Sequence, residues 1–284
     1  MKCINIPKKS GGKRTIYIQG PTEKRKYRYL GYQLSEFYDQ HGNGVAHGFV
    51  EGRSPISNAR QHVNKQYTLS IDLENFFDTI TSEHLNRVGV PFTIALTVCY
   101  KGSIKQGLSS SPSASNCAAI LLDKDVVDLL NVSYESTVYT RYADDLIFSS
   151  DNLKSLLNLK DTVIDLIKHH DFIVNSKKIR VQSSHFGRRY ITGIAVDNEI
   201  HAPRKQKRIL RAMKYNLTKL KRLLFFLWWI NCPTIFAFLL EINRKNIARF
   251  MGLNEWCKLK PPTKSLGGKL FSTYVHVETA KAFK

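Results

Sequence analysis

Three aspartates in two short segments are of the residue type that magnesium-dependent phosphate chemistry needs. Asp144 and Asp145 are adjacent in the segment YADD, and Asp72 lies near the end of the β-prone run YTLSIDL. Mg²⁺ prefers carboxylate oxygens, and two ions roughly 3.5 to 4 Å apart can activate an attacking hydroxyl and neutralise a departing pyrophosphate. That chemistry requires carboxylates held together on rigid strands. An isolated Asp-Asp pair is commonly a solvated turn, so its surroundings must support the metal site.

The segments around these aspartates predict the elements that would position them. Residues 138–149 are typical of two strands with the Asp pair at or beside the turn, and residues 153–169 have the 3.6-residue period of an amphipathic helix. Ser111-Pro112 predicts an N-cap followed by an Ala- and Leu-rich helix to about Leu130. Nearer the N-terminus, residues 4–18 predict a β-hairpin with a glycine turn, and residues 27–38 predict a helix. The order strand, helix, hairpin, helix, strand indicates an α+β fold of the split βαβ type.

The charge of the chain is concentrated at one end. The 284 residues carry a formal net charge of +20, and residues 176–284 hold 23 Lys and Arg against 5 Asp and Glu, which is 18 of those 20 charges. A polyanionic partner explains this excess, although a solvated basic face is the alternative. From residue 203 onward the pattern is helical and basic, so we expect a domain boundary near residues 198–204.

Cysteine usage and hydropathy exclude several other classes. The five cysteines form no CxxC or Cys/His cluster, so neither a disulfide framework nor a zinc site is predicted. The first residues have no apolar signal-peptide region, and a cytoplasmic location is expected. Residues 223–240 are apolar enough to suggest a membrane span, but Pro233 divides them into pieces of the length of buried helices.

Three segments in order resemble the sequence motifs of reverse transcriptases. IDLENFFD (residues 71–78) is similar to polymerase motif A, KQGLSSSPSASN (105–116) to motif B, and RYADDLIFS (141–149) to motif C. With flanking matches, the resemblance covers roughly residues 4–200. HGFVEGRSPISNARQH (47–62), NSKK (175–178) and YITG (190–193) resemble the bacterial retron type in particular.

This resemblance implies a right-hand polymerase fold, with fingers and palm over residues 1–200 and a helical basic thumb over residues 201–284. It also implies that Asp72, Asp144 and Asp145 hold two Mg²⁺ ions, with the Leu73 carbonyl as an extra ligand. Lys178, or the adjacent Lys177, would act as a general acid toward pyrophosphate.

The resemblance also implies contacts to the incoming nucleotide. Phe77 falls at the steric-gate position, where a bulky ring crowds a ribose 2′-OH; the alternative is an ordinary core aromatic, as Phe76 is expected to be. Gln106 and Gly107 begin motif B, in which Ser109 stands where the family often has proline, so a less rigid loop is expected. The first hairpin would grip the triphosphate through Lys13 and Arg14, and also through Lys8 and Lys9 unless these are solvated turn charges.

The nucleic acid would lie along the C-terminal part of the chain. Tyr190 and Gly193 would belong to the primer grip, and a basic helix over residues 203–224 would track an A-form or hybrid duplex through phosphate and minor-groove contacts. Trp228 and Trp229 are expected in the thumb core, with base-stacking platforms as the alternative. The basic residues expected to contact nucleic acid are Arg204, Lys205, Lys207, Arg208 and Arg211.

The function implied is RNA-directed DNA polymerisation of the retron type. A dedicated structured noncoding RNA would serve as template and primer, priming from an internal 2′-OH would give branched RNA-DNA, and an effector protein would join it in antiphage defence. Alternatives are a non-retron defence or group II intron-like reverse transcriptase, an RNA-binding scaffold that restrains a toxin partner, and an RNA-dependent RNA polymerase.

Overall fold

The computed structural model describes residues 1–7 and 12–229, and the side chains of the last helix as far as residue 220. The strands are β1 Lys2–Pro7, β2 Lys13–Ile18, β3 Tyr67–Asp72, β4 Val138–Tyr142, β5 Asp145–Ser150, β6 Arg180–Ser183, β7 Arg189–Ile191, β8 Ile194–Val196 and β9 Ile200–His201. The α-helices are α1 Pro21–His41, α2 Pro55–Arg60, α3 Phe76–Thr79, α4 Ser82–Arg87, α5 Phe92–Val98, α6 Ser111–Ala118, α7 Ile120–Ser133, α8 Leu153–His169 and α9 Arg204–Trp229. Two 3-10 turns are η1 Ser176–Lys178 and η2 Ser184–Phe186.

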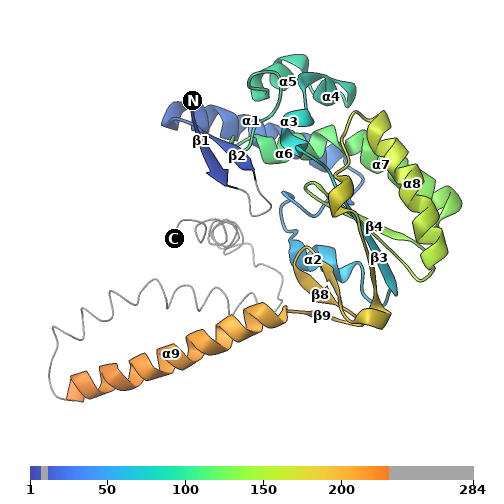
Figure 1. The fold of residues 1–284 in the computed structure, drawn as a ribbon. Coiled ribbons are helices and arrows are strands. Elements are labelled where there is room, and N and C mark those ends of the chain that lie inside the picture. The colour runs from blue at the N-terminus through green and yellow to red at the C-terminus, as the bar shows by residue number, and fades with distance from the viewer. Residues whose placement is uncertain (8–11, 230–284) are drawn as a thin grey trace.

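A four-stranded antiparallel sheet in the order β4-β5-β3-β6 forms the centre of the molecule. Helices α7 and α8 lie together against one face of it (Figure 1). Side chains alternate between the faces of a strand, so Leu146 and Phe148 of β5 point into the core under these helices and Ile147 points away. The split βαβ arrangement predicted from the order of elements is confirmed.

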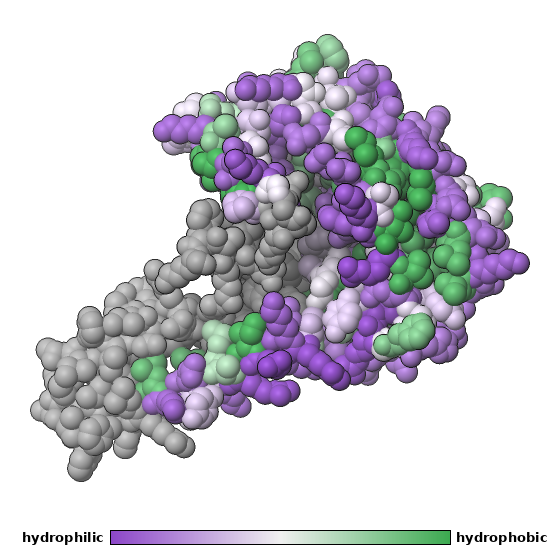
Figure 2. Space-filling view, in the orientation of Figure 1, coloured by the Kyte–Doolittle hydropathy of each residue, from purple (hydrophilic) through white to green (hydrophobic). Residues whose placement is uncertain are grey.

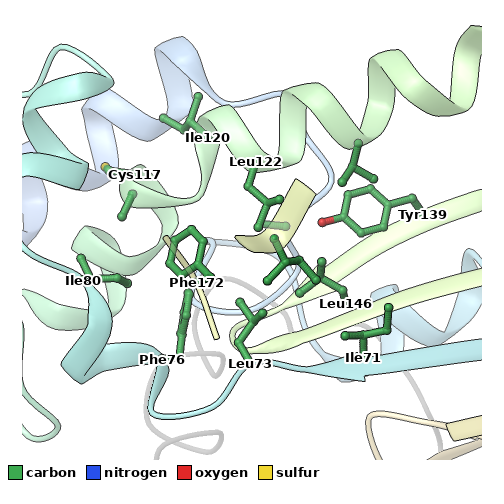
Figure 3. Close-up of a cluster of buried hydrophobic side chains, with 14 of the residues drawn as sticks. Ile71, Leu73, Phe76, Ile80, Cys117, Ile120, Leu122, Tyr139, Leu146 and Phe172 are labelled. Atoms are coloured by element: carbon green, nitrogen blue, oxygen red, sulfur yellow. The ribbon is translucent and has the colours of Figure 1, made fainter. Parts of the chain in front are cut away.

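The main core fills the space between this sheet and its helices (Figure 3). Ile71 and Leu146 from the strands and Leu122 from α7 belong to this core, and Phe76 meets Phe172 beyond the end of β3. Ring centroids of Phe76 and Phe172 are 5.7 Å apart. Burying a large apolar side chain contributes about 1.5 to 3 kcal/mol, so this core fixes the end of β3 relative to the segment after α8.

The opposite face of the sheet carries a smaller second core. Ile147 packs there with Ile56 of α2 and with Ile191, Ile194 and Val196 of the three-stranded sheet β7-β8-β9. From this sheet α9 extends away from the body of the molecule (Figure 1). Hydrophilic residues dominate the surface where α9 begins (Figure 2).

The N-terminal hairpin and α1 form a separate layer. Strands β1 and β2 pair along their whole length, as expected for residues 4–18. Helix α1 packs against α6, where Ser35 Oγ and Ser113 Oγ are 2.7 Å apart and the Cys117 thiol donates to the Leu34 carbonyl. The hairpin is thereby brought beside the segment that precedes α6.

One predicted helix differs from the structure. The Ala- and Leu-rich segment forms two helices, α6 and α7, with Ala119 at φ −90° and ψ 0° between them. The N-cap of α6 is Ser110 and not Ser111, and neither hydroxyl caps the helix: Ser110 makes no side-chain capping hydrogen bond, and the Ser111 hydroxyl donates to the Lys105 carbonyl. In the described part of the chain, no helix is long and apolar enough to cross a membrane. Most of residues 223–240, and the side chains of Trp228 and Trp229, lie outside the description.

A buried histidine behind the sheet gives a pH-dependence prediction. His62 is 0% exposed, with Nδ1 2.8 Å from Ser149 Oγ and Nε2 2.7 Å from Thr140 Oγ1. Burial, and then the charges of Arg189 and His47, lower its pKa from 6.5 to about 3. His62 is therefore protonated below about pH 6.5 in the unfolded chain but only below about pH 3 in the folded protein. The contribution of this pKa difference to the free energy of unfolding is complete above pH 6.5 and is lost as the pH falls toward 3.

We expect the free energy of unfolding to fall by about 1.4 kcal/mol more per pH unit in the wild type than in His62→Gln, between pH 6 and pH 4. Urea denaturation at a series of pH values measures both slopes. Equal slopes would show that His62 is not held neutral by the fold.

Candidate active site

Asp72 and Asp145 are directly opposite each other in the β3–β5 ladder. Because Ile71 and Leu146 point into the main core, the two aspartates beside them point to the other face of the sheet. Opposite residues in an antiparallel pair have Cβ atoms about 4.5 to 5.5 Å apart. The fold therefore brings together two carboxylates that are 73 positions apart in the sequence.

Asp144 completes the group from the turn between β4 and β5. Its carbonyl accepts a hydrogen bond of 2.9 Å from the Leu73 amide, so the turn is fastened to the residue after Asp72. Burial, followed by the charges of Asp144 and Asp72, raises the pKa of Asp145 to about 7. Burial also raises the pKa of Asp144, with a contribution from Asp72. The three carboxylates thus repel one another across a short distance, which is the electrostatic condition that a bound cation relieves.

Lys178 is the cation that contacts this group. Its Nζ lies 2.8 and 2.9 Å from the two carboxylate oxygens of Asp72, and Asn175 Nδ2 donates to the same carboxylate at 3.2 Å. These hydrogen bonds raise the pKa of Lys178, so the side chain stays protonated at neutral pH. Lys177 makes no recorded contact with the aspartates, so of the two lysines named from the sequence the structure brings Lys178 to the site.

The two phenylalanines after Asp72 have different surroundings. Phe76 is 3% exposed and belongs to the main core, whereas Phe77 is half-buried at the edge of it. Their rings are 5.8 Å apart. Of these two rings, Phe77 is therefore the one that is partly accessible from outside the core, which is compatible with a steric gate.

The motif B loop is fastened to the N-terminal hairpin. The Tyr17 amide donates to the Gln106 carbonyl at 2.8 Å, and a Cβ on Gly107 would come within 2.3 Å of the Tyr17 carbonyl oxygen. With φ at +99°, Gly107 is required by this close approach. The loop was expected to be less rigid because Ser109 stands in place of a proline. The Ser109 amide and hydroxyl instead tether it, since both donate to Gln19 Oε1, at 3.0 and 2.9 Å.

The remaining candidate residues lie on the N-terminal hairpin, on the β7–β8 hairpin and on α9. Lys13 and Arg14 are exposed on β2. Burial raises the pKa of Asp144 overall, and the charge of Arg14 is a small effect that opposes this rise, so Arg14 lies within electrostatic reach of Asp144. Tyr190 on β7 is 44% exposed, and Gly193 has φ +79° in the β7–β8 turn. Lys8 and Lys9 fall outside the described residues. The first turns of α9 carry the basic residues Arg204, Lys205, Lys207, Arg208 and Arg211, of which all but Lys207 are exposed.

The structure also shows a buried ion pair next to the β4–β5 turn, which was not among the residues predicted from the sequence. Arg141 and Asp123 are both 0% exposed, and the guanidinium donates to the carboxylate at 2.7 to 3.0 Å. Arg141 Nη1 also donates to the Ala143 carbonyl and to Asn116 Oδ1, and Asn116 Nδ2 donates to the Gly48 carbonyl. The sequence does contain one signal for this pair: Asp123 is spaced to share a helical face with the apolar residues Val126 and Leu130, where an unpaired charge would be costly.

Comparisons with known proteins identify the family. Residues 6–210 match the family described as reverse transcriptase (RNA-dependent DNA polymerase). The fold is similar to that of apo telomerase from Candida Tropicalis truncated from the C-terminal domain, with a TM-score of 0.50 and 14% identity over 71% of this chain and 54% of that one. The chain therefore belongs to the reverse transcriptase family, and its sheet and helices are the right-hand polymerase fold.

Within that family the chain is of the retron type. It is 30% identical to the Retron Ec73 reverse transcriptase of Escherichia coli, over 70% of each chain. It is 27% identical to the Retron Ec86 reverse transcriptase of Escherichia coli, over 70% of this chain and 63% of that enzyme, and 30% identical to the Retron Mx65 reverse transcriptase of Myxococcus xanthus, over 73% and 54%. The chain thus spans between about half and 70% of the length of these relatives.

The family uses divalent metal ions, and the residues present fit such ions by their chemistry. The donors are hard carboxylate oxygens on two adjacent strands and the turn beside them. Burial first, and then the charges of neighbouring aspartates, raises the pKa values of Asp144 and Asp145, and a dication would relieve both effects. Among the described residues, no three acidic, His or Cys side chains are already arranged around one point as metal ligands. The Lys178 ammonium is instead bound to Asp72.

Proposed function

We propose that this protein is an RNA-directed DNA polymerase of the retron type that extends a primer with dNTPs. The observation that carries the proposal is the register of Asp72 opposite Asp145, beside the Asp144 turn, in a chain of the reverse transcriptase family. Mg²⁺ held by these aspartates and the Leu73 carbonyl would supply charge neutralisation at the attacking and leaving oxygens.

The other side chains would act on the substrate around these carboxylates. Lys178 remains protonated because of its hydrogen bonds to Asp72, so it can donate its proton to pyrophosphate once it is released from that carboxylate. Arg14 and Lys13 would bind the triphosphate, and Gln106 with Gly107 would line the nucleotide site. Tyr190 and Gly193 would hold the primer end, and the basic face of α9 would follow the duplex backbone.

The biological setting is part of the same proposal. The RNA would be a structured noncoding transcript that primes from an internal 2′-OH, and the product would be branched RNA-DNA that acts with an effector protein in antiphage defence. The relatives named as retron reverse transcriptases support this assignment. Sequencing the nucleic acid that co-purifies with the protein tests it: branched RNA-DNA is expected, and intron RNA or untemplated DNA would contradict it.

The polymerase activity has a direct test on a generic primed RNA. We expect Mg²⁺-dependent incorporation of dNTPs in preference to rNTPs, and Phe77→Ala should raise rNTP use on the order of tenfold because it removes the ring that crowds a 2′-OH. Primer-extension rates with each triphosphate measure both effects. No incorporation with Mg²⁺ present would favour an RNA-binding scaffold, and equal use of rNTPs by the wild type would favour RNA polymerisation.

A further inference from the structure

Phe49 has a backbone conformation that its side chain disfavours. Its φ is +62°, in the left-handed region where bulky residues are rare. The side chain gains little compensating burial, because it is 46% exposed. A strained residue with an exposed aromatic ring is not explained by packing, and such residues cluster at sites where the conformation serves function.

The segment that precedes Phe49 packs against the turn between β4 and β5, which contains Ala143 and Asp144. A Cβ on Gly48 would lie 2.6 Å from the Ala143 amide nitrogen, so only glycine fits there. The His47 amide donates to the Arg141 carbonyl at 2.7 Å, and Asn116 donates to the Gly48 carbonyl at 3.0 Å. The backbone that precedes Phe49 is therefore held at a fixed position relative to Asp144 and Asp145.

The ring of Phe49 reaches the proposed steric gate. Its centroid is 6.3 Å from that of Phe77, with the planes tilted by 55°. Phe77 also contacts Phe76, at 5.8 Å between ring centroids, so it has one aromatic neighbour in the core and one that is exposed. A half-buried ring with two aromatic neighbours has fewer alternative positions than a ring with one.

We infer that Phe49 is a specificity-determining residue, which holds the Phe77 ring against the sugar of the incoming nucleotide and thereby sets the discrimination between dNTPs and rNTPs. This inference rests on the proposed polymerase function. The left-handed conformation directs the Phe49 side chain toward Phe77, and the close contact of Gly48 with the turn fixes that direction relative to the catalytic aspartates.

A double-mutant cycle tests the coupling. We expect Phe49→Ala to lower dNTP over rNTP discrimination on the order of tenfold although Phe77 is present, and we expect the Phe49→Ala, Phe77→Ala double variant to discriminate no worse than Phe77→Ala alone. Additive effects in the cycle would overturn the inference. Phe92→Ala, which removes a 57% exposed phenylalanine from α5, is the matched control and should discriminate like the wild type.

A second variant separates this role from stability. Phe49→Gly relieves the backbone strain, so its Tm should equal or exceed that of Phe49→Ala, while its discrimination should be as poor. A Phe49→Gly enzyme with wild-type discrimination would overturn the inference. If the wild type incorporates no nucleotide at all, the proposed function fails; if it polymerises and Phe49→Ala discriminates normally, only the role of Phe49 fails.

Discussion

Asp145→Asn is expected to abolish primer extension and, in the same protein, to raise the Tm measured without divalent metal. Loss of one ligand from a two-metal site removes several kcal/mol of charge stabilisation, so extension should fall by about 10³-fold or more. Stability should move the other way, because the wild-type carboxyl is half-buried beside Asp144 and Asp72, and its pKa is raised to about 7. The uncharged amide of asparagine has the same shape, is less costly to bury and is not repelled by the carboxylates of Asp144 and Asp72.

Thermal denaturation with EDTA and with Mg²⁺ measures the second effect. The wild type should gain stability on addition of Mg²⁺, whereas Asp145→Asn should gain much less, since bound ligands stabilise only the form that binds them. Asp161→Asn, at a position whose side chain is 75% exposed, is the matched control and should behave like the wild type. An active Asp145→Asn enzyme would remove this residue from the metal site.

Asp123→Ala is expected to be among the most destabilising single substitutions outside the apolar core. It leaves the Arg141 guanidinium at 0% exposure without its counter-charge, and breaking a buried pair in this way costs about 3 to 5 kcal/mol. The Tyr139 hydroxyl, which donates to Asp123 at 2.7 Å, loses its acceptor as well. Urea denaturation should show the loss directly. Asp128→Ala on the same helix breaks the exposed pair with Lys124 and should cost at most about 1 kcal/mol.

A second variant tests whether the Asp123–Arg141 pair also positions the turn between β4 and β5. Replacing both partners by apolar residues, Asp123→Leu with Arg141→Met, often leaves a fold as stable as before. Arg141 also donates to the Ala143 carbonyl and to Asn116, and Ala143 has φ +56°, so the apolar pair removes contacts that hold a strained turn. We therefore expect a folded protein whose primer extension is reduced. Wild-type extension by that folded variant would show that the pair serves stability alone.

Local patterns predicted those features that depend on a few neighbouring residues. The strand β3, the hairpin of β4 and β5 and the helix α8 were expected at almost the same bounds, because period-2 and period-3.6 apolar spacing reflects which face of an element is buried. The division of residues 111–130 into two helices was not expected, because nothing local to Ala119 interrupts the helical pattern.

Sequence motifs and charge distribution were enough to predict the family, the three aspartates as candidates and the basic character of the C-terminal part. The structure was needed to show that Asp72 faces Asp145 on one side of a sheet and that Asp123 neutralises Arg141. It was also needed to show that Gly48 packs against the backbone of Ala143, about 95 residues away. The physical reason is that register, burial and close backbone approach are properties of residues distant in sequence. Local sequence patterns do not predict which distant residue will pair with a strand, neutralise a buried charge or pack against a glycine.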